Sequence, residues 1–144
     1  MNIPRQQEPS ATNLRALVVD DCATVRRLMD LTLRPMGIEV EFADNGEDAL
    51  ALVKGAGYDI VFLDVLLPGI DGYRVCKAIK GDKRMKDTPV IMLTSRDSAF
   101  DKVRGIMSGT DVYLIKPLER AELLRAMKKC LSQGRAIAWA RAMA

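Results

Sequence analysis

The sequence predicts a doubly wound α/β domain, (βα)5, in which five parallel strands form one sheet between helices. Short runs of β-branched and other apolar residues alternate along the chain with segments whose apolar residues recur at helical spacing. Strands and helices that alternate strictly favour a parallel sheet with right-handed crossovers. The 144 residues, 49% apolar and 28% charged, have the size and composition of about one globular domain.

Five short apolar runs mark the expected strands. The first, third and fourth are almost continuously apolar, which is typical of strands buried on both faces of a parallel sheet. The runs are residues 14–20, 38–43, 59–64, 89–94 and 111–115.

Apolar residues at helical spacing fill the intervals between these runs. We expect the first helix to stop at Pro35-Met36-Gly37 and the second at Gly55-Ala56-Gly57. The fourth contains Gly105, and since an interior glycine costs ~1 kcal/mol relative to alanine, this helix is either marginal and easily shifted or closely packed at that point. The residues that define the five helices are Val25, Leu28, Met29 and Leu33; Ala49, Leu50 and Val53; Val75, Cys76 and Ile79; Phe100, Val103, Ile106 and Met107; and Leu123, Leu124, Met127 and Leu131.

The ends of the chain and its overall composition narrow the functional class. We expect a flexible leader over 1–13, the domain over 14–131, and over 132–144 a tail with Trp139 that extends the last helix and is too short for an output domain. The absence of histidine excludes imidazole catalysis and histidine-ligated zinc. The net charge of +3 indicates no nucleic-acid surface, three scattered cysteines indicate reduced thiols in the cytoplasm, and no apolar run is long enough for membrane insertion.

The chemistry is expected at the carboxyl ends of the strands, where open parallel sheets bind ligands. Polar side chains end four of the runs: Asp20, Asp21, Asp64, Thr94 and Lys116. In the flavodoxin-like strand order 2-1-3-4-5, the first and third strands are neighbours, so their three carboxylates converge and require a cation. Ligation by oxygen alone indicates Mg²⁺.

Asp64, at the end of the middle strand, is the expected nucleophile, because a carboxylate that attacks a phosphoryl group forms an aspartyl phosphate. Lys116 would balance charge on the phosphoryl oxygens, and Thr94 would donate a hydrogen bond to one of them. Taken singly, Asp21 is as easily a helix N-cap and Asp64 a turn residue. The conjunction of four strand ends favours a single phosphoryl-transfer site.

This set of residues resembles the receiver domain of two-component response regulators. The resemblance covers about residues 14–131 and rests on the motifs LVVDD, FLDVLLPGIDGY, PVIMLTS and GTDVYLIKP, in the order of that family. It implies that Asp64 is the phosphoacceptor and that Asp20 and Asp21 lie with it at a Mg²⁺ site, where Mn²⁺ can substitute. The backbone carbonyl of Leu66 is expected to complete the protein ligands.

The resemblance also implies the parts of a conformational switch. Thr94 corresponds to the switch hydroxyl, Tyr113 to the switch aromatic and Lys116 to the phosphate partner, and the Lys116–Pro117 peptide is expected to be cis. Phosphorylation would draw Thr94 inward and vacate space into which Tyr113 turns, unless Tyr113 is ordinary core of an edge strand.

Three residues, Cys22, Leu66 and Leu118, depart from the family's usual pattern, Leu118 standing where phenylalanine is common. Leu66, two residues after the phosphoacceptor, offers no side chain that could hold an attacking water, and Arg96, two residues after Thr94, reaches over the same pocket. We therefore expect slow autodephosphorylation. Cys22 follows the acidic pair where small polar residues are more usual, and we expect it to pack.

The function implied is that of a phosphoprotein switch, not an enzyme in its own right. The phosphoryl donor is a histidine kinase or a histidine phosphotransfer protein, since this chain has no histidine. The expected output is contact with a target protein through the face formed by helix 4 (around 100–107), strand 5 (111–115) and helix 5 (around 123–131). A homodimer that forms on phosphorylation is a second possible output. AFDKVRGIMSGTDVYLIKP is similar to single-domain receivers of type IV pilus and chemotaxis-like systems.

Three other functions fit the fold less well. A phosphorylation-independent pseudo-receiver, used for docking or dimerisation, does not need the intact acidic set. A phosphatase of the haloacid-dehalogenase type needs DxD after the first strand, where this chain has an adjacent pair. A nucleotide-binding domain needs a glycine-rich loop that opens a helix, whereas Gly55-Ala56-Gly57 precedes a strand.

Overall fold

The computed structural model describes residues 14–95 and 109–131, and within them five parallel strands form one sheet in the order β2-β1-β3-β4-β5. The predicted strand order is therefore confirmed. Every strand begins one residue later than its apolar run, and the first also ends one residue earlier. The strands are β1 (Arg15–Val19), β2 (Glu39–Ala43), β3 (Ile60–Asp64), β4 (Val90–Thr94) and β5 (Val112–Ile115).

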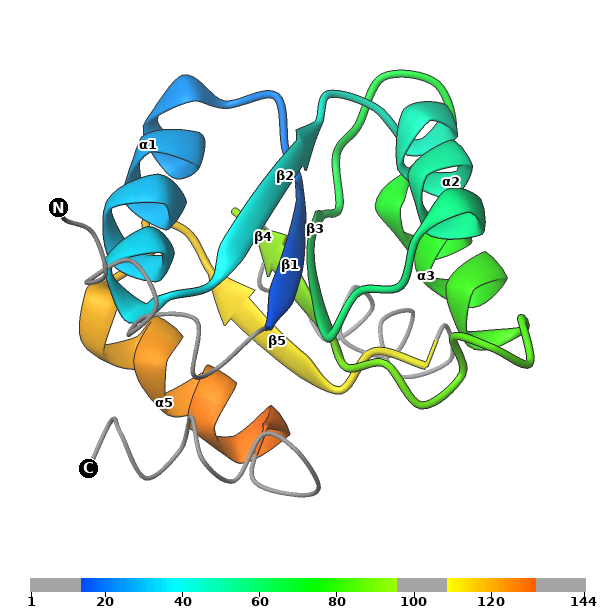
Figure 1. The fold of residues 1–144 in the computed structure, drawn as a ribbon. Helices are drawn as coiled ribbons and strands as arrows, with labels where there is room; N and C mark the ends of the chain where they lie inside the picture. The colour runs from blue at the N-terminus through cyan, green and yellow to red at the C-terminus, as the bar shows by residue number, and fades with distance from the viewer. Residues whose placement is uncertain (1–13, 96–108, 132–144) are drawn as a thin grey trace, which may run out of the picture.

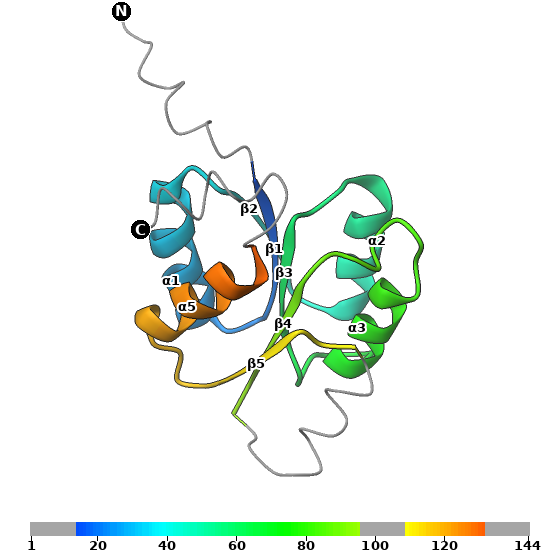
Figure 2. The same ribbon diagram turned by 90° about the horizontal axis from the view of Figure 1, so that it is seen from below.

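Helices cover both faces of this sheet, as Figures 1 and 2 show: α1 and α5 lie on one face, and α2 and α3 on the other. The described helices are α1 (Ala23–Leu33), α2 (Gly46–Gly55), α3 (Gly72–Lys80) and α5 (Arg120–Cys130). The expected leader over 1–13, the expected fourth helix with Gly105, the position of Arg96, and the tail over 132–144 with Trp139 lie outside the described residues.

The helix ends follow from local sequence signals. The Asn45 side chain accepts a hydrogen bond from the backbone N–H of Asp48 at the start of α2, and Asp71 does the same for Arg74 at the start of α3. After α1 the chain makes one 3₁₀ turn, η3 (Arg34–Met36), and leaves it at Gly37, whose φ of 81° favours glycine. The predicted stops of the first two helices are thus confirmed.

The hydrophobic core consists of two clusters, one on each face of the sheet. Phe62 and Leu93 point toward the α1 and α5 face, while Leu63 and Met92 point toward the α2 and α3 face. All residues of β3 and β4 are buried, which confirms the prediction from their continuous apolar runs. The central strands therefore hold the carboxyl ends of the sheet in fixed positions.

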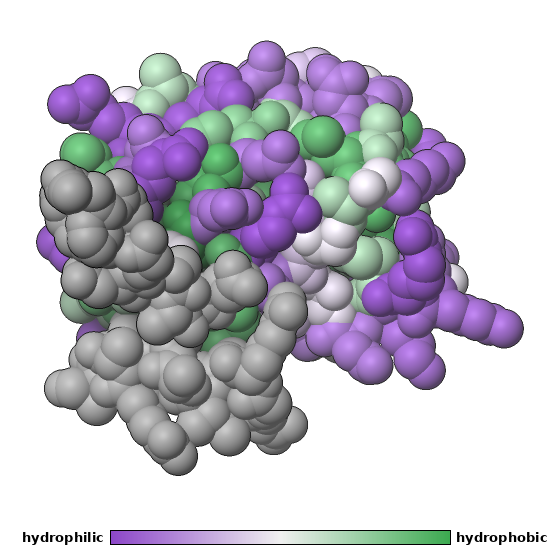
Figure 3. Space-filling view, in the orientation of Figure 1, coloured by the Kyte–Doolittle hydropathy of each residue, from purple (hydrophilic) through white to green (hydrophobic). Residues whose placement is uncertain are grey.

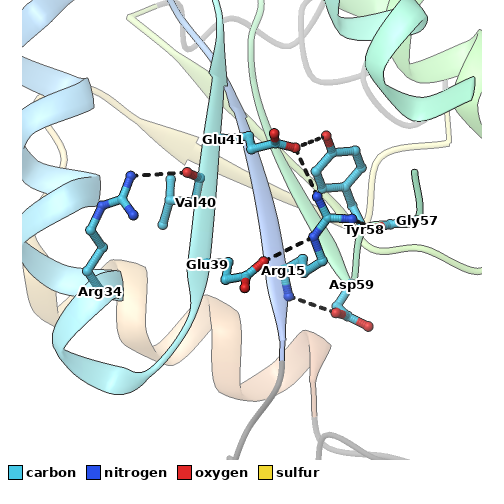
Figure 4. A network of polar contacts seen from close by, with 8 residues as sticks. All are labelled: Arg15, Arg34, Glu39, Val40, Glu41, Gly57, Tyr58 and Asp59. Atoms are coloured by element: carbon cyan, nitrogen blue, oxygen red, sulfur yellow. Dashed lines mark hydrogen bonds and ion pairs between the residues drawn. The ribbon is translucent and has the colours of Figure 1, made fainter. Parts of the chain in front are cut away.

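At the amino edge of the sheet, polar groups form a closed network that Figure 4 shows and that we call the amino-edge cluster: Arg15, Glu39, Glu41, Tyr58 and Asp59. The Arg15 guanidinium lies 3.3 Å from Glu39 Oε1 and 3.1 Å from Glu41 Oε1. It also lies 5.0 Å from the centre of the Tyr58 ring. The Tyr58 hydroxyl donates to Glu41, and the backbone N–H of Arg15 donates to Asp59 Oδ2 at 2.8 Å. One cation here contacts two carboxylates, and a backbone N–H donates to the third.

Hydrophilic residues dominate the face seen in Figure 3, with smaller apolar patches between them. No helix in the described part of the chain is long and apolar enough to cross a membrane. No disulfide joins the cysteines: Cys76 is buried, and Cys22 and Cys130 are partly exposed. Burial, the largest cause, and the charge of Asp111 raise the pKa of the Cys130 thiol to about 11.

Candidate functional site

The polar residues that follow the strands meet at the carboxyl edge of the sheet. We call them the carboxyl-edge cluster: Asp20, Asp21, Asp64, Thr94 and Lys116. Asp20 is fully buried, Asp64 is 6% exposed and Thr94 is 1% exposed, whereas Asp21 is open to solvent and Lys116 is partly buried. The structure therefore brings together the five residues that end four of the predicted runs.

Lys116 lies between two of the buried carboxylates. Its Nζ is 2.9 Å from Asp20 Oδ2 and 3.5 Å from Asp64 Oδ2. The backbone N–H of Lys116 donates to the carbonyl oxygen of Thr94 at 2.6 Å, which ties the lysine to the end of β4. The peptide bond between Lys116 and Pro117 is cis, as predicted. One cation therefore serves two buried anions, and the pocket keeps an excess of negative charge.

The pKa values of this pair reflect that excess. Burial, and then the charge of Asp20, raise the pKa of Asp64 from 3.8 to about 6, although Lys116 and the N–H of Leu66 oppose the rise. Burial lowers the pKa of Lys116, but its hydrogen bonds and charge interactions with Asp20 and Asp64 outweigh this and raise it above 10.5. The lysine is therefore held as a cation, while Asp64 is ionised at some cost.

The same carboxylates have the geometry of a cation site. One oxygen each from Asp20, Asp21 and Asp64 lie within 4.8 Å of one another. Asp20 Oδ2 is buried and accepts no hydrogen bond of good geometry, its close neighbour being the Lys116 ammonium. Oxygen donors, surplus negative charge and a buried acceptor with no hydrogen bond of good geometry fit a hard divalent cation such as Mg²⁺.

Tight backbone contacts position Asp64. The N–H of Val65 donates to Leu93 O, and the N–H of Gly72 donates to Val65 O at 2.9 Å, so the start of α3 is tied to the end of β3. A Cβ on Gly72 would lie 2.2 Å from Asp64 O. Leu66 is 53% exposed, and its N–H donates to Asp64 Oδ1 at 3.3 Å. Its expected role as a carbonyl ligand stays a prediction.

The expected switch residues lie on one face of the sheet. Tyr113 pairs with Met92 in the register of β4 and β5, and Thr94 follows Met92 by two residues, so both side chains project toward the α2 and α3 face. Tyr113 is partly buried, and its hydroxyl lies 3.0 Å from the hydroxyl of Tyr73. Sequence reasoning assigned no role to Tyr73, and no signal in the sequence pointed to one.

Comparison with known proteins agrees with this geometry. The family model described as "Response regulator receiver domain" matches residues 16–128. The chain is 42% identical to the protein PilG of Pseudomonas aeruginosa over 84% of this chain and 90% of that protein. It spans a smaller share of other curated relatives, 48% and 47% of two transcriptional regulators that are each 38% identical.

Solved structures show the same fold. The chemotaxis response regulator CheY4 of Vibrio cholerae aligns with a TM-score of 0.77 and 34% identity, over 82% of this chain and 98% of that one. The receiver domain of the sensor histidine kinase PA1611 from Pseudomonas aeruginosa, solved with a magnesium ion in its active-site cleft, aligns with a TM-score of 0.76 and 28% identity over 83% and 98%.

Proposed function

Because the chain belongs to the receiver domain family of response regulators, whose members serve phosphorylation-based signalling, we propose that Asp64 is its phosphoacceptor. The observation that carries this proposal is the position of Asp64: it ends the central strand, is 6% exposed, and has Lys116 Nζ 3.5 Å from its Oδ2. An anionic oxygen, a fixed cation beside it and a neighbouring cation site are what attack on a phosphoryl group requires.

In the proposed reaction an Asp64 carboxylate oxygen attacks the phosphorus of a phosphohistidine on the donor protein. A P–O bond forms, the P–N bond breaks, and its electron pair stays on the imidazole nitrogen of the donor. With a pKa of about 6, Asp64 is mostly ionised at neutral pH and so available as the nucleophile. Lys116 then lies where it can pair with the oxygens of the transferred phosphoryl group.

The side chains that would hold a metal are Asp20, Asp21 and Asp64, joined by the backbone carbonyl of Leu66. When bound, Mg²⁺, or Mn²⁺ in its place, supplies the positive charge that offsets the three carboxylates and the incoming phosphoryl group. Asp20 contributes its buried Oδ2, the acceptor that lacks a hydrogen bond of good geometry.

We propose that the signal is a change at Thr94 and Tyr113. The phosphoryl group adds nearly two negative charges and strong acceptors at Asp64, which draw the Thr94 hydroxyl and leave room for the Tyr113 ring. The exposed apolar side chain of Leu66 cannot hold an attacking water, so loss of the phosphoryl group is slow. Arg96, outside the described residues, is proposed to slow it further.

The proposed partners follow from this chemistry. The chain contains no histidine, so a histidine kinase or a histidine phosphotransfer protein must donate the phosphoryl group. The proposed target is a protein that reads the face to which β5 and α5 contribute, with a second copy of the chain as an alternative occupant after phosphorylation. The net charge of +3 gives no support to a nucleic-acid partner.

The first test is phosphorylation with acetyl phosphate and Mg²⁺, with the mass of the intact protein measured by mass spectrometry. The second is incubation with candidate kinases and radiolabelled ATP. Wild type is expected to gain one phosphoryl group and Asp64→Ala none, while the exposed Asp87→Asn serves as a matched control. Label that persists on Asp64→Ala contradicts the assignment. A wild-type chain that takes no label and binds no beryllofluoride would instead be a docking module that works without phosphorylation.

A further inference from the structure

The hydroxyl groups of Tyr73 and Tyr113 lie 3.0 Å apart, which joins the first turn of α3 to β5. Tyr73 is 4% exposed, and both rings pack in the core cluster that lies between the sheet and helices α2 and α3. In this arrangement the Tyr113 side chain is turned into the molecule. A hydrogen bond between two partly desolvated phenols favours that orientation over one in which the ring points to solvent.

Tyr73 is held by the part of the molecule that carries Asp64. It follows Gly72, whose N–H donates to Val65 O at 2.9 Å. The approach there is close enough that a Cβ on Gly72 would lie 2.2 Å from the carbonyl oxygen of Asp64. The backbone that carries Tyr73 is therefore tied to the end of β3, and its side chain, 4% exposed, is packed in the core.

We propose that Tyr73 is a positioning residue for the switch: its hydroxyl holds Tyr113 turned inward, the orientation that the phosphorylated state uses. This inference rests on the proposed function, in which Thr94 moves toward the phosphoryl group and Tyr113 fills the space it leaves. The inward orientation of Tyr113 and a phosphoryl group at Asp64 favour the same state of the protein. A hydrogen bond that stabilises the inward orientation therefore strengthens binding of a phosphoryl group, or of a phosphoryl analogue, at Asp64.

The test compares beryllofluoride binding, in the presence of Mg²⁺, by wild type and Tyr73→Phe. The substitution removes the hydroxyl and keeps the ring, and we expect roughly two- to tenfold weaker binding, the range that one hydrogen bond supports. In the beryllofluoride-free protein, ring signals of ¹³C-labelled Tyr113 should move toward the values of an exposed tyrosine. The chain has three tyrosines, so single Tyr→Phe variants assign every ring signal.

Two further variants separate positioning from general stability. Tyr58→Phe also removes a hydroxyl from a largely buried tyrosine, but at the amino edge, and should bind beryllofluoride as wild type does. Tyr73→Phe combined with Tyr113→Phe should bind no more weakly than Tyr113→Phe alone, because the two residues share one bond.

The possible outcomes separate a failure of the inference about Tyr73 from a failure of the proposed function. If wild type binds beryllofluoride and Tyr73→Phe binds equally well, or if the two losses simply add, Tyr73 does not position the switch and the proposed function stands. If wild type itself does not bind beryllofluoride, the proposed function fails, and the inference fails with it.

Discussion

At the amino edge of the sheet Arg15 meets two carboxylates, a tyrosine ring and a backbone carbonyl, whereas at the carboxyl edge Lys116 stands alone between the buried Asp20 and Asp64. The amino-edge acids are partly exposed, with side-chain exposures of 76% for Glu39 and 47% for Glu41, so water shares their charge. Asp20 is fully buried and has one oxygen without a good hydrogen bond.

The difference separates a structural network from a binding site. At the amino edge, solvent shares the charge of the partly exposed acids, so adding a ligand would gain little there. At the carboxyl edge, Lys116 alone faces two buried carboxylates, and the surplus negative charge of this partly desolvated pocket favours binding of a cation. We expect the stability of the carboxyl edge to depend on what is bound there, and four experiments test the difference between the two edges.

The largest effect is expected from adding one methyl group at the carboxyl edge. Gly72→Ala puts a Cβ 2.2 Å from Asp64 O and 2.9 Å from Val65 Cα, both of them backbone atoms, and should lower the free energy of unfolding by about 3 kcal/mol or more. Gly57→Ala, beside the amino-edge cluster, meets nothing within 4 Å and should change it by less than about 1 kcal/mol. Urea unfolding measures both, and equal costs would contradict the contrast.

Removing the charge of Asp64 should stabilise the metal-free protein, and the gain should depend on pH. The pKa of Asp64 is about 6 in the folded protein and 3.8 ordinarily, so as pH rises Asp64 ionises in the unfolded chain before it does in the folded protein. Wild type therefore loses stability as pH rises from about 4 to about 6. Between pH 4 and pH 7 the advantage of Asp64→Asn should grow by up to about 3 kcal/mol, at 1.36 kcal/mol per pKa unit.

Thermal and urea unfolding in the presence of a chelator provide the measurement for this prediction. Asp87→Asn, at an exposed position, is the control for adding an amide in place of a carboxylate. Mg²⁺ should restore wild-type stability at pH 7 and have little effect on Asp64→Asn. A stability difference that stays constant from pH 4 to pH 7 would show that the pocket does not penalise the Asp64 charge.

Breaking the amino-edge cluster should cost less. Arg15→Met removes two partly exposed ion pairs, worth about 0–1 kcal/mol each, and a cation–π contact worth about 0.5–1 kcal/mol, so we expect a loss of about 1–2 kcal/mol that shrinks in high salt. Arg27→Met, at an exposed position on α1, is the matched control. Beryllofluoride binding should not change, since β1 separates the two edges by about 16 Å; a weakened affinity would show that the edges are coupled.

The smallest effect is expected from Tyr58→Phe, which removes the hydroxyl that donates to Glu41 and should cost about 0.5–1 kcal/mol at pH 7. Burial first, and then this hydrogen bond, raise the pKa of Tyr58 from 10.0 to about 12. The unfolded chain therefore ionises first, and wild type should lose stability between pH 10 and pH 12 while the variant does not. Phenolate absorbance against pH follows the titration directly, and a midpoint near 10 in the folded protein would refute the shift.

The strands and the meeting of the acidic residues could be predicted because topology alone determines them. Strands buried on both faces must be almost continuously apolar, and the carboxyl ends of parallel strands must share an edge. The one-residue error at the strand starts also has a local cause. Asp59 and Asp111 precede β3 and β5, and their side chains accept hydrogen bonds from the first N–H of a neighbouring strand, Arg15 and Val90 respectively.

Contacts set by side-chain reach could not be predicted. The Tyr73 and Tyr113 hydroxyls are 40 residues apart in sequence and meet only because α3 and β5 are packed at a particular distance. The role of Gly72 depends on the carbonyl oxygen of Asp64 standing where a Cβ would be. Lys116 was expected beside the phosphoacceptor, yet its Nζ lies nearer Asp20, at 2.9 Å against 3.5 Å to Asp64.

The three cysteines give the site an intrinsic place for a reporter group. Cys76 is buried, and at neutral pH the Cys130 thiol, with its pKa of about 11, is protonated and slow to react. Cys22 is partly exposed, and its backbone N–H donates to Asp20 Oδ1 at 2.8 Å. A maleimide fluorophore should therefore attach to Cys22 first, and its emission would follow ions and phosphoryl groups entering the pocket with no residue of the chain replaced.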